Sequence, residues 1–416
     1  MPGRWMWAYP NFVRLWAGQT LSLAGDAFTE VALTVWALRL GHGSGLAVGT
    51  MLLAASVPRI GLGWLVPLVI DRWDKRRLMW WADAARAAVV AAIPFLPGLG
   101  AMWAAVFGVQ ALGMFYLPAV RAVAPETVPT TQIPAATAAL AASQAAAQIA
   151  GFVLAGAVVW RWGPTVAFWA DAASYLVCGA SVWTLTLDRR VWQPRPGPTG
   201  DGFVQELREG LAYHLREPRV LHLLAVSAWA GLALNGLTVL GAVAVLRLWH
   251  ETPGFYGLLM AAMAGGFLFG STGFSRWHPK GRYGWWIAGG LGLGGGLSVA
   301  LAWTPSPWAA AALFGGMGWS NAAFLLPMRS WIGQVVPLEY RGRVYATRSV
   351  VLAAAGALSA VAGGWLAQVA GVRLGLEVLG ATLVGAGWYA WRVPAIRAIA
   401  VPAWTGGPSR PATGND

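Results

Sequence analysis

The sequence predicts an all-helical integral membrane protein with twelve transmembrane helices arranged as two parallel six-helix repeats. Three observations lead to this fold class. The 416 residues are 57% hydrophobic and only 11% charged, whereas soluble domains carry about 25% charged residues. Apolar runs of about 20 residues, the length that spans a bilayer, recur along the chain. The order of motifs in the first half is also echoed in the second half, which indicates an internal duplication.

The apolar runs predict six helices on each side of a long polar segment. Each run is bounded by Gly, Pro or charged residues, so its limits are expected to hold to within a few residues. The expected helices of the first half are 13–40, 46–70, 78–97, 100–120, 134–160 and 165–187. The expected helices of the second half are 220–247, 254–275, 284–303, 307–327, 345–370 and 372–392.

The polar segment 188–219 divides the chain into two halves. Its first part is Pro-rich, and its second part places Leu207, Leu211 and Leu215 at helical spacing between charges. This pattern is typical of an amphipathic helix on the membrane surface. We therefore expect an N-terminal half, a cytoplasmic linker, a C-terminal half and a disordered cytoplasmic tail. Their ranges are 1–187, 188–219, 220–392 and 393–416.

The basic residues predict the orientation of these helices. The net charge of +13 comes from Lys and Arg clustered in short loops, which argues against nucleic acid as a partner. With both termini cytoplasmic, only Arg39, Arg161, Arg247 and Arg373 lie at outer helix ends, and Arg59 lies within a span. All other basic residues fall on the inner side, as the positive-inside rule requires. We expect a multi-pass protein of a prokaryotic cytoplasmic membrane.

Two motifs occur once in each half, in the same order. RWDKRRLMWW at 72–81 corresponds to RWHPKGRYGWW at 276–286, each in the loop between the second and third helices of its half. FYLP at 115–118 corresponds to FLLP at 324–327, each at the exit from a fourth helix, and each is followed by VP. Matches in the same order and the same class of loop are typical of parallel repeats.

The loop PLVIDRWDKRRLMWW at 67–81 resembles a motif of the major facilitator superfamily, roughly G-x-x-x-D-R-x-G-R-[KR]. The matching residues are Asp71, Arg72, Lys75, Arg76 and Arg77. Pro67 and Asp74 stand where the motif has Gly. The variant D-R-W-D-[RK]-R-R is similar to that of the enterobactin-exporter and macrolide-efflux subgroup of this superfamily, and weaker matches extend to about residue 392.

The resemblance implies the major facilitator fold, alternating access and a substrate site between the halves. It also implies a conformational latch, in which Asp71 caps the inner start of helix 11 while Arg72 and Arg76 pair with neighbouring acids. Unpaired N–H groups give such a helix end a positive character that favours a carboxylate. The latch would close the inner side and favour the outward-open state.

Three ionisable residues within the first two spans are candidates for proton coupling. Asp26 and Glu30 share one face of helix 1 because they are four residues apart, and Arg59 lies at a similar depth on helix 2. Ionisable groups inside a membrane are costly and mark functional sites. We expect Arg59 to neutralise one carboxylate, while burial and a like charge favour protonation of the other. An alternative is a fixed ion-pair cluster that only positions these helices.

Other polar residues within spans are candidates for the substrate cavity. They are Gln110, Gln144, Gln148, Asp171, Asn235, Asn321 and Gln368. Each could instead hydrogen-bond between helices. Asp83 and Arg86 are three residues apart near the inner end of helix 3, and we interpret them as a structural pair.

No enzyme or metal site is expected. The five His are scattered, a phosphate-binding loop is absent, and Cys178 is the single cysteine, so we expect no cofactor. The favoured function is proton-coupled export of amphipathic small molecules resembling drugs, macrolides or siderophores. The alternative is a lipid or lysolipid flippase or an uncoupled facilitator. The expected partners are a small-molecule substrate, protons and membrane lipids, and the protein is expected to be a monomer.

Overall fold

A computed structural model describes residues 6–63, 65–193, 202–277 and 282–399. These residues are almost entirely helical and include no strand. The long helices of the N-terminal half are α1 (Pro10–Leu40), α2 (Gly45–Gly61), α3 (Leu65–Arg72), α4 (Lys75–Ala92), α5 (Gly98–Val123), α6 (Ile133–Trp162) and α7 (Pro164–Trp183). Those of the C-terminal half are α10 (Pro218–Arg247), α11 (Phe255–Trp277), α12 (Tyr283–Ala302), α13 (Pro307–Val335), α14 (Leu338–Val369) and α15 (Gly371–Arg392).

Shorter helices connect the spans or flank them. They are η1 (Met6–Ala8), η2 (Ile93–Phe95), η3 (Ala124–Thr127), η4 (Thr130–Gln132), α8 (Arg189–Trp192), α9 (Gly202–Arg216) and α16 (Pro394–Arg397). Ten helices in the described residues are long and apolar enough to cross a membrane. The two remaining spans of the twelve are the second, which is split, and α15, which carries Arg373 and Glu377.

The second span differs from the single helix expected over 46–70. In the structure α2 ends at Gly61 and a separate helix, α3, begins at Leu65. Pro58 lies inside α2 and has no backbone N–H to donate. Gly61 ends α2 and Gly63 follows in a bend, and glycine weakens a helix by its conformational freedom. Because these breakers fall within a few residues, the apolar run continues but the helix does not.

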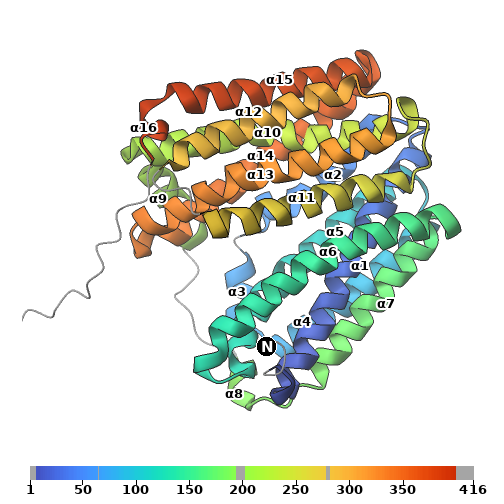
Figure 1. Cartoon of the computed structure of the whole chain (residues 1–416). Coiled ribbons are helices and arrows are strands. Elements are labelled where there is room, and N and C mark those ends of the chain that lie inside the picture. Colours follow the sequence, from blue (N-terminus) through green and yellow to red (C-terminus); the bar gives the residue numbers. More distant parts are fainter. Residues whose placement is uncertain (1–5, 64, 194–201, 278–281, 400–416) are drawn as a thin grey trace, which may run out of the picture.

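The helix packing repeats between the halves, as the sequence motifs predict. α1 packs on α7 as α10 packs on α15, and α4 packs on α7 as α12 packs on α15. α2 packs on α5 as α11 packs on α13. The chain is therefore two parallel six-helix bundles, which are distinct units in Figure 1.

The two halves touch mainly through α2 with α14 and α6 with α11. Figure 1 shows the halves diverging toward the end that carries η1, α8, α9 and α16, here called the α9 end. At the opposite end, a Cβ on Gly156 would lie 2.6 Å from the Gly254 carbonyl oxygen, and one on Gly364 would lie 2.5 Å from that of Gly45. Glycine thus permits backbone contact there. Arg247 adds a 3.1 Å hydrogen bond to the Gly43 carbonyl and closes that end.

The second part of the linker forms α9, which lies against the start of α14. Glu209 forms a 2.7 Å salt bridge with Arg343, and Tyr213 stacks on Tyr340 with ring centroids 4.9 Å apart. Leu211 and Leu215 are exposed, as expected for a helix whose apolar face meets lipid. Residues 194–201 lie outside the described part of the chain.

The start of the tail is ordered, in contrast to the expectation for 393–416. Residues 394–397 form α16, and Ile396 and Ile399 are buried in the core. A Cβ on Gly284 of α12 would lie 2.8 Å from the Cα of Arg397. Burial of two isoleucine side chains stabilises this segment against the core. The sequence after residue 404 has no large apolar residue that could be buried in the same way. The expectation of disorder for 400–416 falls outside the described residues.

Candidate functional site

A cavity of about 320 Å³ lies between the halves and is formed mostly by the N-terminal half. α1, α2, α4, α5 and α7 contribute to its wall, and α10 is its contribution from the C-terminal half. Its polar and charged lining residues are Asp26, Thr29, Glu30, Ser56, Arg59, Arg86, Gln110, Tyr175 and Asn235. Apolar residues such as Leu33 and Met51 separate these groups. A wall of this kind suits a ligand that is partly apolar.

A salt bridge between α1 and α4 lies at the centre of this wall. The Arg86 guanidinium donates to the Asp26 carboxylate at 2.9 Å and to the Tyr175 hydroxyl at 2.6 Å. The Tyr175 hydroxyl also donates to Asp26, so the three groups form a closed triangle. Asp26 remains partly accessible from the cavity, whereas the Arg86 side chain is almost buried. Three helices are therefore joined through one carboxylate that a proton can still reach.

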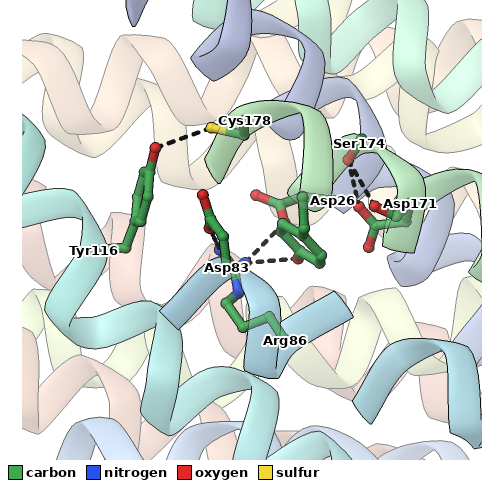
Figure 2. Close-up of polar contacts among 8 residues, drawn as sticks. Asp26, Asp83, Arg86, Tyr116, Asp171, Ser174 and Cys178 are labelled. Atoms are coloured by element: carbon green, nitrogen blue, oxygen red, sulfur yellow. Dashed lines mark hydrogen bonds and ion pairs between the residues drawn. The ribbon is translucent and has the colours of Figure 1, made fainter. Parts of the chain in front are cut away.

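Arg86 has a second carboxylate close by. Asp83, one turn earlier on α4, places a carboxylate oxygen 3.8 Å from the guanidinium and is 0% exposed. Neither Asp83 oxygen has a hydrogen-bond partner. Figure 2 shows Asp83 pointing toward Tyr116 and Cys178, which contact each other at 2.9 Å. A buried carboxylate without hydrogen bonds is costly when ionised. A closer approach of Arg86 would lower that cost.

Asp171 on α7 is a second buried acid beside this triangle. It accepts a 3.0 Å hydrogen bond from Ser174, and both residues come from the same turn of α7. Its second oxygen, Oδ2, is buried without a partner. Asp171 does not line the cavity directly and lies behind Asp26. The arrangement gathers three carboxylates around one guanidinium.

Arg59 is not the partner of a helix 1 carboxylate, and the structure corrects that expectation. Asp26 pairs with Arg86, while Arg59 lines the cavity and makes no salt bridge within 4.0 Å to a described residue. The similar depth expected for Arg59 and the helix 1 carboxylates did not bring them into contact. Arg59 lies in the last turn of α2, close to the break before α3. Glu30 also lines the cavity, and its carboxylate has no hydrogen bond or salt bridge within the described chain.

The other candidate cavity residues divide into three groups. Gln110 and Asn235 line the cavity from α5 and α10. Gln144 and Gln148 are exposed on α6 and do not contribute to it, and Asn321 lines a separate, much smaller pocket in the C-terminal half. Gln368 hydrogen-bonds to Ser44 at the closed end between the halves. Helical spacing identifies a shared face but does not determine which neighbour covers it.

The predicted latch lies in the turn between α3 and α4. Asp74 caps α4 by accepting a 2.9 Å hydrogen bond from the Arg77 N–H. Lys75 donates to the Gln193 carbonyl at 3.0 Å. Arg76 donates to the Leu185 carbonyl and lies over the Trp192 ring, 4.6 Å from its centroid. Arg76 therefore contacts the segment after α7 rather than an acid, which corrects that expectation.

Two expectations for the latch have different outcomes. Arg72 is exposed and makes no salt bridge to a described residue, so the acid partner expected for it is absent from the described chain. The side chain of Asp71 lies outside the described residues, and its proposed contact with helix 11 stays a prediction. Lys75 and Arg76 point toward the segment 185–193 because backbone carbonyl oxygens of that segment accept hydrogen bonds from them.

Sequence reasoning assigned too small a role to Arg86 and missed Tyr175. Both the spacing of Asp83 and Arg86 and their place within a span were visible, and intramembrane charge by itself is a functional signal. Their separation of one turn suggested a local pair. The structure shows that the shorter contact of Arg86 is with α1, 60 residues earlier in the chain.

Comparison with known proteins agrees with this architecture. The family model of the Major Facilitator Superfamily matches residues 15–314. An uncharacterized MFS-type transporter of Bacillus subtilis (strain 168), YfiS, is 24% identical over 90% of this chain and 91% of its own length. Macrolide efflux protein A of Streptococcus pyogenes is 24% identical over 62% of this chain and 65% of its own length.

Two solved structures share this fold at low sequence identity. The peptide transporter POT in complex with sulfate has a TM-score of 0.75 at 11% identity, covering 93% of this chain and 95% of that one. A bacterial homolog of the human lysosomal transporter Spinster, in an inward-facing and occupied conformation, has a TM-score of 0.72 at 14% identity, covering 93% and 96%. Together with the family match over most of the chain, the twelve-helix duplicated architecture shows that this protein belongs to the major facilitator superfamily.

Proposed function

We propose that this transporter exports amphipathic small molecules, resembling drugs, macrolides or siderophores, across the cytoplasmic membrane of a prokaryote in exchange for protons. The observation that carries the proposal is the ionisable cluster in the cavity wall, where Asp26 bridges to Arg86 beside an unpaired Glu30. Such groups are expensive within a membrane and serve ion coupling in carriers. A macrolide efflux protein among the similar sequences supports export of large, partly apolar molecules.

The orientation follows from the distribution of basic residues. We propose that the α9 end is cytoplasmic, because Lys75, Arg76 and Arg77 and the basic residues of α8 and α9 lie there. The halves diverge at this end and are in contact at the other, and we propose that this arrangement is an inward-open state of alternating access. Both termini would then be cytoplasmic, and a single copy of the chain would complete the cavity.

The coupling step uses competition for one guanidinium. A proton that binds Asp26 removes its negative charge and weakens its contact with Arg86. Arg86 is then free to approach Asp83, which lies 3.8 Å away and lacks hydrogen bonds. The Glu30 carboxylate, which has no hydrogen bond or salt bridge to a described residue, is the second group in the cavity that can take or release a proton. We propose that the pairing of Arg86 changes with the direction in which the cavity opens.

The test is uptake into proteoliposomes under an imposed pH gradient, with fluorescent cationic and macrolide-like molecules as substrates. Wild type is compared with Asp26→Asn and Glu30→Gln, and Glu377→Gln on α15 is the matched control because that acid lies outside the cavity. We expect gradient-driven accumulation in wild type and the control, and its loss in at least one cavity variant. Full proton-dependent transport by both cavity variants would refute the coupling role.

A second outcome bears on the class of transport. If no substrate responds to the pH gradient but movement down a concentration gradient persists, the protein is an uncoupled facilitator. Movement of labelled phospholipid or lysolipid between leaflets, without a proton response, would identify a flippase. In either case Asp26 and Arg86 would serve as a structural ion pair that positions α1 against α4.

A further inference from the structure

Arg348 is a buried positive charge in the C-terminal half. It lies on α14, ten residues from the start of that helix, which is about 15 Å along its axis. Its side chain is 5% exposed. Nε donates to the Ser227 hydroxyl of α10 at 3.1 Å, but Nη2 is buried without any hydrogen-bond partner. A guanidinium offers five donors in a rigid fork, so much of its binding capacity is unused here.

No carboxylate in the described chain neutralises Arg348. The acids described at the same end of the C-terminal half are Glu209, which pairs with Arg343, and Glu217 at the start of α10. Arg329 of α13 is near enough to act on Arg348 electrostatically, and it has the same sign. Tyr345 fixes the geometry by donating to the Arg329 carbonyl at 3.0 Å. Two arginines, one from α13 and one from α14, therefore act on each other, and the described side chains include no acid that pairs with Arg348.

An isolated charge in this environment is costly unless a counter-charge is supplied. Arg86 in the N-terminal half shows the usual solution, since it has two carboxylates within 4.0 Å. Arg348 has none among the described residues, and a counter-ion from outside the chain would match both its charge and its unpaired Nη2. A carboxylate, phosphate or sulfonate matches the guanidinium fork because it accepts two parallel hydrogen bonds.

The position of Arg348 indicates which molecule would carry the anion. Its partner Ser227 lies eight residues, about 12 Å along α10, from Asn235 in the cavity wall, on the side of the α9 end. A ligand that reaches both places needs an apolar part within the cavity and an anionic end near α13 and α14. We propose that Arg348 and Arg329 form an oxyanion-binding site for the charged end of an amphiphile. Its source is either a transported molecule or an anionic phospholipid, and the former rests on the function proposed above.

The test measures binding of decyl phosphate to the purified full-length protein in a neutral detergent. Decyltrimethylammonium, with the same chain and the opposite charge, is the matched probe. We expect Arg348→Gln to weaken decyl phosphate binding at least tenfold and Arg329→Gln to weaken it several-fold. Neither variant should change binding of the cation. Arg373→Gln, at the opposite end of the C-terminal half, is the control and should behave as wild type.

Equal binding of decyl phosphate by wild type and both variants would overturn the proposal. So would an equal loss of both probes, because it would indicate a general change in the cavity rather than lost recognition of an anion. Arg329→Gln keeps the test decisive if Arg348→Gln fails to fold, because the Arg329 side chain is exposed. Arg348→Lys keeps the charge without the fork, and it should give intermediate affinity.

The source of the anion is separated by repeating the measurement in lipid nanodiscs. Competition by phosphatidylglycerol that disappears in Arg348→Gln assigns the site to a lipid headgroup. Absence of such competition, together with Arg348-dependent uptake of a fluorescent anionic amphiphile, assigns it to substrate. Binding that persists without any response to a pH gradient refutes proton-coupled transport and leaves this site standing. Gradient-driven transport with decyl phosphate binding insensitive to both variants refutes this site alone.

Discussion

The two halves share a helix arrangement and differ in how they treat buried charge. In the N-terminal half, Asp26, Asp83 and Asp171 surround Arg86, so acids outnumber the base. In the C-terminal half, Arg348 and Arg329 lie near each other and no acid in the described chain pairs with Arg348. A duplicated fold has thus kept its packing while its buried charged clusters differ, with acids in excess around Arg86 and no described acid beside Arg348. This difference agrees with the two proposals above, in which the N-terminal half binds protons and the C-terminal half binds an anion.

Replacing each central arginine should separate the halves most clearly. Arg86→Gln leaves the buried Asp83 and the partly buried Asp26 without their counter-charge, and we expect it to lower the free energy of unfolding by about 3–5 kcal/mol. Arg348→Gln removes an unneutralised charge, and we expect a change below about 1 kcal/mol or a gain. Thermal denaturation of both variants in the same detergent measures this. Equal destabilisation would show that Arg348 has a partner comparable to Asp26.

Giving Arg348 an internal acid should make the C-terminal half resemble the N-terminal half. Ser227→Asp places a carboxylate where the hydroxyl now accepts from Nε at 3.1 Å. A charge-assisted hydrogen bond contributes about 1.5–3 kcal/mol, so we expect a higher melting temperature and loss of decyl phosphate binding. Ser227→Asn is the neutral control. Retained anion binding by the Asp variant would show that the anion occupies another place.

The loop between α3 and α4 allows a test that leaves the buried clusters intact. Asp71→Asn removes the carboxylate expected to cap the start of α14, and we expect several-fold slower transport with normal membrane insertion. Uptake in proteoliposomes, normalised to the amount of inserted protein, measures the effect. Asp74→Asn is the matched control because Asp74 caps α4 within its own loop. Normal transport by Asp71→Asn would argue against the latch.

The smallest effect is expected from His214 on α9, outside the membrane spans. Burial lowers the pKa of this imidazole below its usual value, against the opposing effect of its contact with the Gly210 carbonyl at 2.6 Å. Because the folded pKa is depressed, neutral His214 contributes stability above about pH 6.5, and this stability is lost as pH falls. We expect His214→Gln to make the melting temperature fall slightly less as the pH is lowered below about 6.5, measured by thermal denaturation at a series of pH values. An unchanged pH profile would show that protonation of His214 is not linked to folding.

The sequence determined the fold and many helix boundaries because both depend on local chemistry. Apolar runs of spanning length must form helices in lipid, where every backbone polar group needs an internal partner. The repeated motifs then predict two equal bundles, and α10 and α15 begin and end within two residues of the expected limits. Pro58, Gly61 and Gly63 were visible too, but helix breakers in a long apolar run do not reveal whether the helix kinks or stops.

Only the tertiary structure decided the pairing of charges. Sequence spacing placed Asp26, Glu30 and Arg59 at one depth, yet depth leaves the rotation of each helix undetermined. The contact of Arg86 with Asp26 joins residues 60 positions apart, and Arg348 meets Ser227 across 121 positions. A long side chain reaches several neighbours, and which one it meets depends on how all the helices around it pack. Composition and periodicity therefore determined the helices and their duplicated arrangement. Packing decided that the buried Arg86 of one half pairs with acids, whereas the buried Arg348 of the other half pairs with no acid in the described chain.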